Sequence, residues 1–182
     1  MRARASSWNY YIFKYERVAK WENCIKLISE FSTVERFWSL LLGTQRVSEL
    51  QKGTDVLTFK SNIEPKWEAP QNQNGGRWLM ANIFKDDVDR YWEEILMLLI
   101  GSAWETDVED EQVCGAVFQS RSRGSKLSVW TSDASDVETV MRIGRRVKNV
   151  VRYPDPLFYQ TVEEQKVASR GTDVLSGTYK ID

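Results

Sequence analysis

IEPKWEAPQNQNGGRW, residues 63–78, is the stretch that the rest of the chain is predicted to support. It places Trp67 directly before Glu68, in a loop bounded by Pro65 and Pro70. An indole face attracts a planar cation, and a carboxylate can accept two parallel N–H bonds from the edge of a ligand. The loop is therefore predicted to bind a flat, cationic ligand that presents neighbouring hydrogen-bond donors.

The segments that flank this loop have the periodicity of regular structure. Residues 55–60 (DVLTFK) and 77–84 (RWLMANIF) are predicted to be strands. Residues 86–100 open with acidic side chains, carry apolar side chains around most of the circumference and stop before Gly101. This pattern predicts the most buried helix of the fold.

Two strands are predicted nearer the N-terminus, at residues 8–14 (WNYYIFK) and 24–28, and the segment 1–7 is predicted to be flexible. Trp21 falls at a loop-to-strand junction instead of inside an apolar run. Most tryptophans serve as packing residues, but this position makes a ligand contact as plausible as a place in the core.

Two further helices are predicted. The first begins near Thr33, because Ser32 and Glu35 have the spacing of a capping box. The second spans residues 135–150, with valines along one stripe and arginines mostly on the other faces, where a solvated surface is favoured over nucleic-acid binding. A last strand is predicted at residues 157–161.

Residues 113–121 (VCGAVFQSR) and 126–131 (KLSVWT) flank a turn that contains Gly124, and both alternate with a period of two, which predicts a β-hairpin. Alternation groups Gln119, Arg121 and Arg123 on one arm, and Lys126, Ser128 and Trp130 on the other. The cations and the indole converge at one end of the sheet if the turn aligns these two sides. The sequence leaves that register open.

Composition excludes several classes of protein. The 182 residues include no histidine, which removes the Ser-His-Asp and Cys-His catalytic systems and most zinc sites. No Gly-rich phosphate loop is present, and no close carboxylate pair stands out from the solvated acidic runs. Neither catalysis nor a metal or cofactor is expected.

Length, charge and cysteine content indicate the number of domains, the kind of nucleic-acid contact and the cellular compartment. The chain is expected to form a single α+β domain over residues 8–161, followed by a polar loop or tail at 162–182. A net charge of −1 argues against binding of long nucleic acid through bulk electrostatics, so any such contact should be local. Cys24 and Cys114 lie far apart, and no apolar run is long enough for a signal or a membrane span. A reduced, cytoplasmic monomer is expected, with the nucleus as a second compartment.

Several motifs occur in a familiar order: Trp21, the helix start at residues 32–38, IEPKWE, GGRW, CGAV, the basic segment at residues 121–126 and KLSVWT. In this order the sequence resembles the eukaryotic translation initiation factor 4E family, the mRNA cap-binding proteins. The resemblance covers roughly residues 8–160. It implies a curved antiparallel sheet of about eight strands, backed on its convex face by three long helices, with the cap in the concave face.

The resemblance also implies roles for individual residues. Trp21 and Trp67 correspond to the indoles that sandwich the methylated guanine, Glu68 to the carboxylate that accepts its N1 and N2 hydrogens, and Trp130 to the contact of the N7-methyl group. The implied phosphate ligands are Arg121 and Lys126, with Arg77 and Arg123 nearby.

The methylated guanine has the properties that the loop of Trp67 and Glu68 is predicted to recognise. A guanine methylated at N7 is flat, cationic and rich in donors. Stacking contributes on the order of 1–3 kcal/mol per base, and the positive charge adds about 1–2 kcal/mol when desolvated. Two indole faces therefore favour the methylated base over plain guanine, and the carboxylate excludes adenine, which lacks the matching donors.

A second surface is implied for a protein partner. Six residues correspond to the site where the family binds the helical motif of scaffolds and repressors, namely Val34, Glu35, Trp38, Glu94, Met97 and Gly101. The main hypothesis is an initiation factor that binds capped mRNA and recruits such a scaffold.

Two other hypotheses remain open. Glu93 stands where the family usually has a leucine, and the usual His-Pro-Leu segment before the first strand is missing. These departures motivate a divergent cap-binding paralogue that binds the scaffold weakly and represses or specialises translation. In the third hypothesis the tryptophans are only packing residues, of a carboxylate-dependent enzyme or a plain interaction domain.

Overall fold

The fold is built on one eight-stranded sheet, which a computed structural model describes together with its connections over residues 6–16, 19–168 and 176–182. The strand order is β2-β1-β3-β5-β6-β4-β7-β8, and each described pair is antiparallel. The strands are β1 (Trp8–Lys14), β2 (Ile25–Phe31), β3 (Thr54–Lys60), β4 (Gly76–Ile83), β5 (Val113–Gln119), β6 (Ser125–Thr131), β7 (Leu157–Thr161) and β8 (Tyr179–Ile181). Apart from residues 6 and 7, the segment predicted to be flexible lies outside the described residues.

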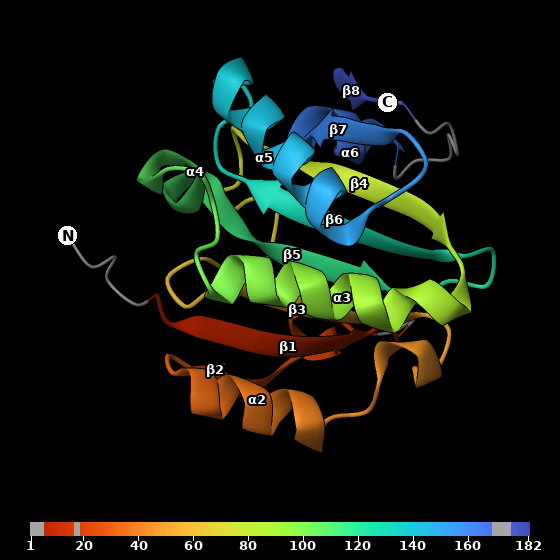
Figure 1. Ribbon diagram of the computed structural model, residues 1–182. Coiled ribbons are helices and arrows are strands. Elements are labelled where there is room, and N and C mark those ends of the chain that lie inside the picture. Colours follow the sequence, from red (N-terminus) through yellow and green to blue (C-terminus); the bar gives the residue numbers. More distant parts are fainter. Residues whose placement is uncertain (1–5, 17–18, 169–175) are drawn as a thin grey trace.

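Three long helices of the described chain cover one face of the sheet (Figure 1). They are α2 (Val34–Gly43), α3 (Lys85–Ile100) and α5 (Val137–Val151). Shorter helices are α1 (Trp21–Cys24), α4 (Asp107–Gln112) and α6 (Val162–Ala168), with a 3-10 turn, η1 (Val47–Glu49). The predicted α+β class, an antiparallel sheet with helices packed on it, is confirmed. No described helix is both long enough and apolar enough to cross a membrane.

The main core lies between these helices and the sheet. In α3, Ile95 and Leu99 are completely buried, and Trp92 is nearly so. They pack in one cluster with sheet residues such as Phe118 and Val129. Burial of each such side chain contributes roughly 1.5–3 kcal/mol, so the apolar circumference of α3 places this helix at the centre of the fold.

Trp78, on β4, joins the sheet to α5. Its buried indole donates a hydrogen bond from Nε1 to the carbonyl oxygen of Val140 at 2.8 Å, and it packs edge-on against Tyr159 with ring centroids 5.2 Å apart. Gly144 faces the same indole, and a Cβ at this position would lie 2.4 Å from Cε2 of Trp78. The close approach of α5 to β4 therefore requires glycine at position 144.

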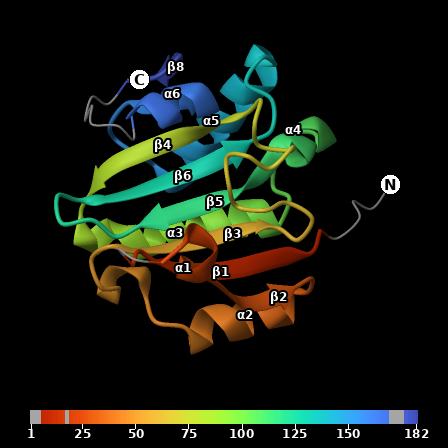
Figure 2. The same ribbon diagram turned by 180° about the vertical axis from the view of Figure 1, so that it is seen from behind.

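The opposite face of the sheet carries α1 and the loop between β3 and β4 (Figure 2). A smaller apolar cluster lies there, made of Leu57, Phe59, Ile63, Cys114, Val117 and Trp130. The strand register sets Phe59 opposite Gly115, Gly115 opposite Trp130, and Trp130 opposite Arg77. An aromatic ring and a guanidinium are thus neighbours on this second face.

Some local predictions differ from the structure. The second strand runs to Phe31, further than the predicted residues 24–28. The N-cap of α2 is Thr33, not Ser32, because the hydroxyl of Thr33 accepts the N–H of Arg36 at 3.3 Å. The acidic segment that follows Gly101 contains the helix α4, for which no helix was predicted; Thr106 caps α4 together with Glu109 in a capping box.

Residues 162–182, predicted as a polar loop or tail, contain α6 and β8. Strand β8 pairs with β7, where Tyr179 lies opposite Tyr159. Val162 and Gln165 of α6 are buried. The segment has few apolar residues, but the edge of β7 supplies backbone partners for a strand, which overrides its weak local preference.

Replacing Gly144 by Ala is expected to lower the free energy of unfolding by about 1–3 kcal/mol, because the added methyl group overpacks against the indole of Trp78. Urea denaturation followed by circular dichroism measures this loss. Gly43→Ala, at the end of α2, is the matched control, since a Cβ there meets no atom within 4 Å. Equal stability of the two variants would contradict the described packing.

Candidate functional site

A cavity of about 550 Å³ lies on the second face of the sheet. Its lining residues are Phe13, Trp21, Glu22, Asp55, Leu57, Pro65, Lys66, Trp67, Glu68, Arg77, Val117, Gln119 and Trp130. Five of the residues predicted to bind the ligand therefore meet here: Trp21, Trp67, Glu68, Arg77 and Trp130. They come from α1, the β3–β4 loop, β4 and β6. We call this space the aromatic cavity.

Trp21 is the first residue of α1, where a loop-to-strand junction was predicted. Cys24, the last residue of this short helix, is buried. The ring of Trp21 contacts Phe13 of β1 with centroids 6.0 Å apart, and 40% of the residue is exposed. A large part of the indole is thus available to a ligand.

Trp67 is held in its loop by backbone and side-chain hydrogen bonds. The buried Asn72 donates from Nδ2 to the carbonyl oxygens of Glu64 and Lys66, at 2.9 and 2.8 Å, and so closes the loop around Trp67. The carboxylate of Glu68 is exposed and lines the cavity beside the indole. The loop thus presents a ring and an anion side by side.

Two buried glutamines connect Trp67 with Arg77. Gln165 of α6 accepts the indole N–H of Trp67 at 3.1 Å and donates to the carbonyl oxygen of Gln160 at 3.1 Å. The side-chain oxygen of Gln160 accepts from Nε and Nη2 of Arg77, at 3.3 and 3.1 Å. We call Gln160 and Gln165 the glutamine pair. The glutamine pair, on β7 and α6, thus orients the side chains of Trp67 and Arg77.

Arg77 lies at the closely packed junction of β4 and β7. Burial lowers the pKa of its guanidinium to about 10, while the nearby charge of Asp55 acts in the opposite direction. The group therefore stays protonated at neutral pH. The preceding Gly76 lets β7 approach, because a Cβ there would lie 2.5 Å from the carbonyl oxygen of Gln160.

The register of the β5–β6 hairpin shows which side chains of its two arms lie on the same face of the sheet, which the sequence left open. Gln119 lies opposite Lys126, and Gly115 lies opposite Trp130, so Gln119, Lys126 and Trp130 share the cavity face. Lys126 is half-buried and, unlike Gln119 and Trp130, does not line the cavity.

Arg121 and Arg123 lie beyond the end of β5 and line a neighbouring cleft instead of the aromatic cavity. The guanidinium of Arg121 forms a two-pronged ion pair with Asp55, in which Nη2 donates to Oδ2 at 3.0 Å. Gln119 donates to the same Oδ2 at 3.1 Å. Because Asp55 lines the aromatic cavity, Arg121 marks the boundary between the two spaces.

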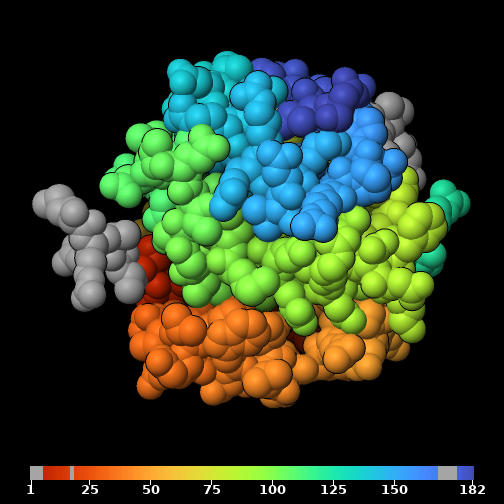
Figure 3. Space-filling model, in the orientation of Figure 1, coloured from red at the N-terminus to blue at the C-terminus, as the bar shows by residue number. Residues whose placement is uncertain are grey.

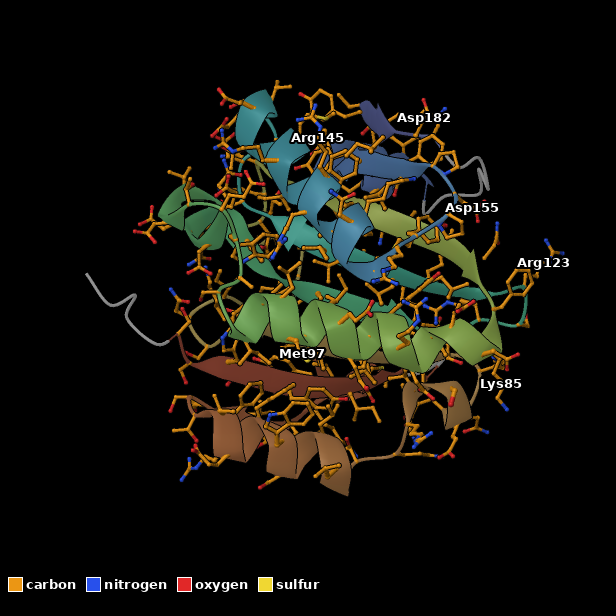
Figure 4. The ribbon with its side chains drawn as sticks, viewed as in Figure 1. Lys85, Met97, Arg123, Arg145, Asp155 and Asp182 are labelled. Carbon is orange, nitrogen blue, oxygen red and sulfur yellow. The ribbon has the colours of Figure 1, made fainter. Side chains whose placement is uncertain are left out.

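The residues predicted to bind a partner lie on the helical face. Val34, Trp38 and Met97 are 60%, 41% and 44% exposed, on α2 and α3. Glu35 begins α2, Glu94 pairs with Arg90 at 3.2 Å, and Gly101 caps α3. Figure 3 shows the surfaces of α2 and α3 running alongside each other, and Figure 4 shows Met97 on the side of α3 toward α2. The sheet separates this surface from the aromatic cavity.

Asp55 and the glutamine pair contribute to the site but were not identified from the sequence. Nothing in the sequence marked Asp55 as a site residue; it was only the first residue of a predicted strand. Gln165 lies 98 residues from Trp67 in the chain, inside a segment predicted to be loop. No local pattern connects residues so far apart.

Comparisons with known proteins add to this geometry. The chain matches the family model described as Eukaryotic initiation factor 4E over residues 5–175. Eukaryotic translation initiation factor 4E of Aplysia californica is 39% identical over 180 residues, which cover 97% of this chain and 82% of that protein.

Solved structures are similar in fold and sequence. One is a schistosome eIF4E complexed with m7GpppG and 4E-BP, with a TM-score of 0.93, 49% identity, and coverage of 97% of this chain and 96% of that one. Another is Ascaris suum eIF4E-3 in complex with an m2,2,7G cap, with a TM-score of 0.85, 34% identity and the same two coverages.

Replacing Gln165 by Met is expected to shift the indole N–H resonance of Trp67 in a ¹H–¹⁵N NMR spectrum, because the acceptor at 3.1 Å is lost. The free energy of unfolding should fall by about 1–2 kcal/mol, since hydrogen-bonding groups are left unpaired. Gln73→Met, at an exposed position in the loop that carries Trp67, is the control and should change neither quantity. An unshifted Trp67 resonance in Gln165→Met would rule out the orienting role.

Proposed function

The chain belongs to the eukaryotic initiation factor 4E family, and on that premise we propose that it binds the 7-methylguanosine cap of messenger RNA in the aromatic cavity. It acts as a non-enzymatic translation initiation factor in the cytoplasm, with the nucleus as a second compartment. The observation that carries the proposal is that Trp21, Trp67 and Glu68 line one cavity. The relatives that were solved with m7GpppG and with an m2,2,7G cap support it.

The methylated base stacks between the indoles of Trp21 and Trp67. Both rings line the cavity and keep exposed surface, so stacking on the base removes apolar area from water. The delocalised positive charge of the base is attracted to the face of each ring, by roughly 0.5–2 kcal/mol per contact depending on desolvation. Trp130, at the sheet end of the cavity, contacts the N7-methyl group.

Glu68 recognises the edge of the base. Its two carboxylate oxygens accept the N1–H and N2–H donors of guanine as parallel hydrogen bonds. Adenine presents no such pair of donors, so the carboxylate would remain unpaired against it. The exposed position of Glu68 next to Trp67 supports this role, because stacking and edge recognition then depend on one short loop.

The phosphates lie toward the basic end of the site. Arg121 and Lys126 bind the phosphates directly, and Arg77 and Arg123 lie nearby. A guanidinium has five N–H donors, so Arg77 and Arg121 can bind phosphate oxygens while they keep the contacts with Gln160 and Asp55. These contacts orient the two side chains before the ligand arrives.

Titration with 7-methyl-GTP is expected to quench tryptophan fluorescence at concentrations about tenfold or more below those needed for GTP, because only the methylated base carries the charge that the two indoles attract. Glu68→Gln should weaken 7-methyl-GTP binding by about tenfold, since a hydrogen bond to a charged group is lost. Glu64→Gln, an exposed carboxylate of the same loop that does not line the cavity, is the control. Equal responses to 7-methyl-GTP and GTP would refute the proposal.

Trp67→Ala separates this function from a pure packing role of the tryptophans. Loss of 7-methyl-GTP binding with an unchanged circular dichroism spectrum supports cap binding. Loss of the fold without a specific ligand defect would favour an interaction domain or a carboxylate-dependent enzyme.

The helical face binds the scaffold or repressor. Val34, Trp38 and Met97 form an apolar surface on α2 and α3, with Glu35, Glu94 and Gly101 around it. An amphipathic helix from the partner lays its apolar side on such a surface. The schistosome structure, which is complexed with 4E-BP, supports this assignment.

Glu93 favours a second candidate function, a divergent cap-binding paralogue with weakened scaffold binding. Glu93 is exposed and lines a small cleft with Leu41 of α2, so a charge stands at the rim of the partner surface. An apolar partner residue would have to desolvate that charge.

Binding of a scaffold-type helical peptide distinguishes these two functions. For a scaffold-binding initiation factor, Trp38→Ala should lower peptide affinity by about thirtyfold or more, as expected for a central aromatic contact. For the divergent paralogue, the parent chain should bind weakly and Glu93→Leu should restore affinity. Val137→Ala, an exposed apolar residue of α5, is the control in calorimetry.

A further inference from the structure

A second cleft, of about 310 Å³, opens at the end of the sheet beside the aromatic cavity. It is formed by the turn before β3, the junction of β4 with α3, and the β5–β6 turn. Its cationic lining residues are Lys52, Lys85, Arg121 and Arg123, and no described carboxylate lines it. Figure 4 shows Lys85 and Arg123 at the same end of the molecule. We call this space the basic cleft.

The positive charge of the basic cleft is only partly compensated. Lys52 and Lys85 are exposed, and neither forms an ion pair within the described part of the chain. Asp86 follows Lys85 in the chain but does not line the cleft, and Asp89 accepts the backbone N–H and the hydroxyl of Ser48 at 2.9 and 2.7 Å. Two lysine charges therefore remain available to an anion.

An exposed aromatic ring lies in the same cleft. Phe84, the residue before α3, is 80% exposed although the main core of the fold is close by. A basic groove with an aromatic platform is the arrangement that binds single-stranded nucleic acid, because phosphates pair with the cations and a base stacks on the ring. An acidic peptide would account for the lysines but not for the exposed ring.

The basic cleft and the aromatic cavity adjoin each other at one ion pair. Arg121 lines the cleft, and its partner Asp55 lines the cavity. A polyphosphate chain that leaves the cavity past Arg121 thus arrives at the cleft. We propose that the basic cleft binds the nucleotides that follow the cap, with phosphates at Lys52 and Lys85 and a base on Phe84. This inference rests on the proposed function, because the cap must occupy the neighbouring cavity.

The test compares two ligands on the full chain, 7-methyl-GTP and a capped, unstructured RNA of about ten nucleotides, a length within the range that single-strand sites cover. Affinity is measured at several salt concentrations. The capped RNA is expected to bind about tenfold more tightly, and its log affinity should fall more steeply with log salt, by about 0.7 for each further phosphate neutralised.

Variants of the cleft should affect only the RNA. The double variant Lys52→Gln, Lys85→Gln is expected to lower the affinity for capped RNA and to reduce the salt slope by about 1.4, with 7-methyl-GTP binding unchanged. Phe84→Ala should weaken RNA binding by about fivefold or more without a change of slope, because a stacking contact is uncharged. Lys26→Gln on β2 and Leu42→Ala on α2, both exposed positions outside the cleft, are the matched controls.

The outcomes separate this inference from the proposed function. Binding of 7-methyl-GTP in every variant shows that each one folds and that the cap site is intact. Equal affinity and salt slope for the two ligands, or cleft variants that match the controls, would overturn the RNA site and leave cap binding standing. Cleft variants that bind capped RNA as the controls do are also expected if the cleft binds an acidic peptide. Failure of the parent chain to bind either ligand would overturn both.

Discussion

The burial of Trp78 between β4 and α5 determines on which side of the sheet Arg77 lies, because neighbouring residues of a strand point to opposite faces. The same constraint acts on β6, where the fully buried Val129 belongs to the helix-side core and Trp130 turns to the cavity. The core packing of the helices therefore orients the floor of the aromatic cavity. Gly144 is part of this constraint, since only glycine lets α5 come close enough to bury the indole.

The site also shows how a chain with a net charge of −1 can bind an anionic ligand. Its cations are few and are oriented by neutral or acidic partners, Arg77 by Gln160 and Arg121 by Asp55. Burial lowers the pKa of Arg77 only to about 10, so the charge is retained. Holding each guanidinium in place before binding reduces the entropy that a ligand contact must overcome. Selectivity thus arises from placement of charge and not from its total amount.

The sheet divides the molecule into two binding surfaces. The aromatic cavity and the basic cleft involve the open face and one end of the strands, whereas Trp38 and Met97 lie on the helices of the other face. Under these proposals, a nucleic acid and a helical partner occupy separate surfaces of the molecule. Phe84 and Trp38 are both exposed aromatic residues, but the first lies among lysines and the second among apolar side chains, so we propose an RNA contact for Phe84 and a protein contact for Trp38.

The sequence alone determined the features that depend on short-range pattern. Alternation predicted most strands, and the apolar circumference of residues 86–100 predicted the central helix. The Trp67-Glu68 loop suggested the class of ligand that we propose. The capping box of Thr106 and Glu109 was also readable at this level but was missed. Only the tertiary structure decided the hairpin register, the ordering of residues 162–168 and 179–181, and the contacts of Arg121 with Asp55 and of Trp67 with Gln165. The reason is physical: periodicity reflects which face of one element is buried, whereas a hydrogen bond between distant polar side chains exists only once chain reversals have brought their strands together.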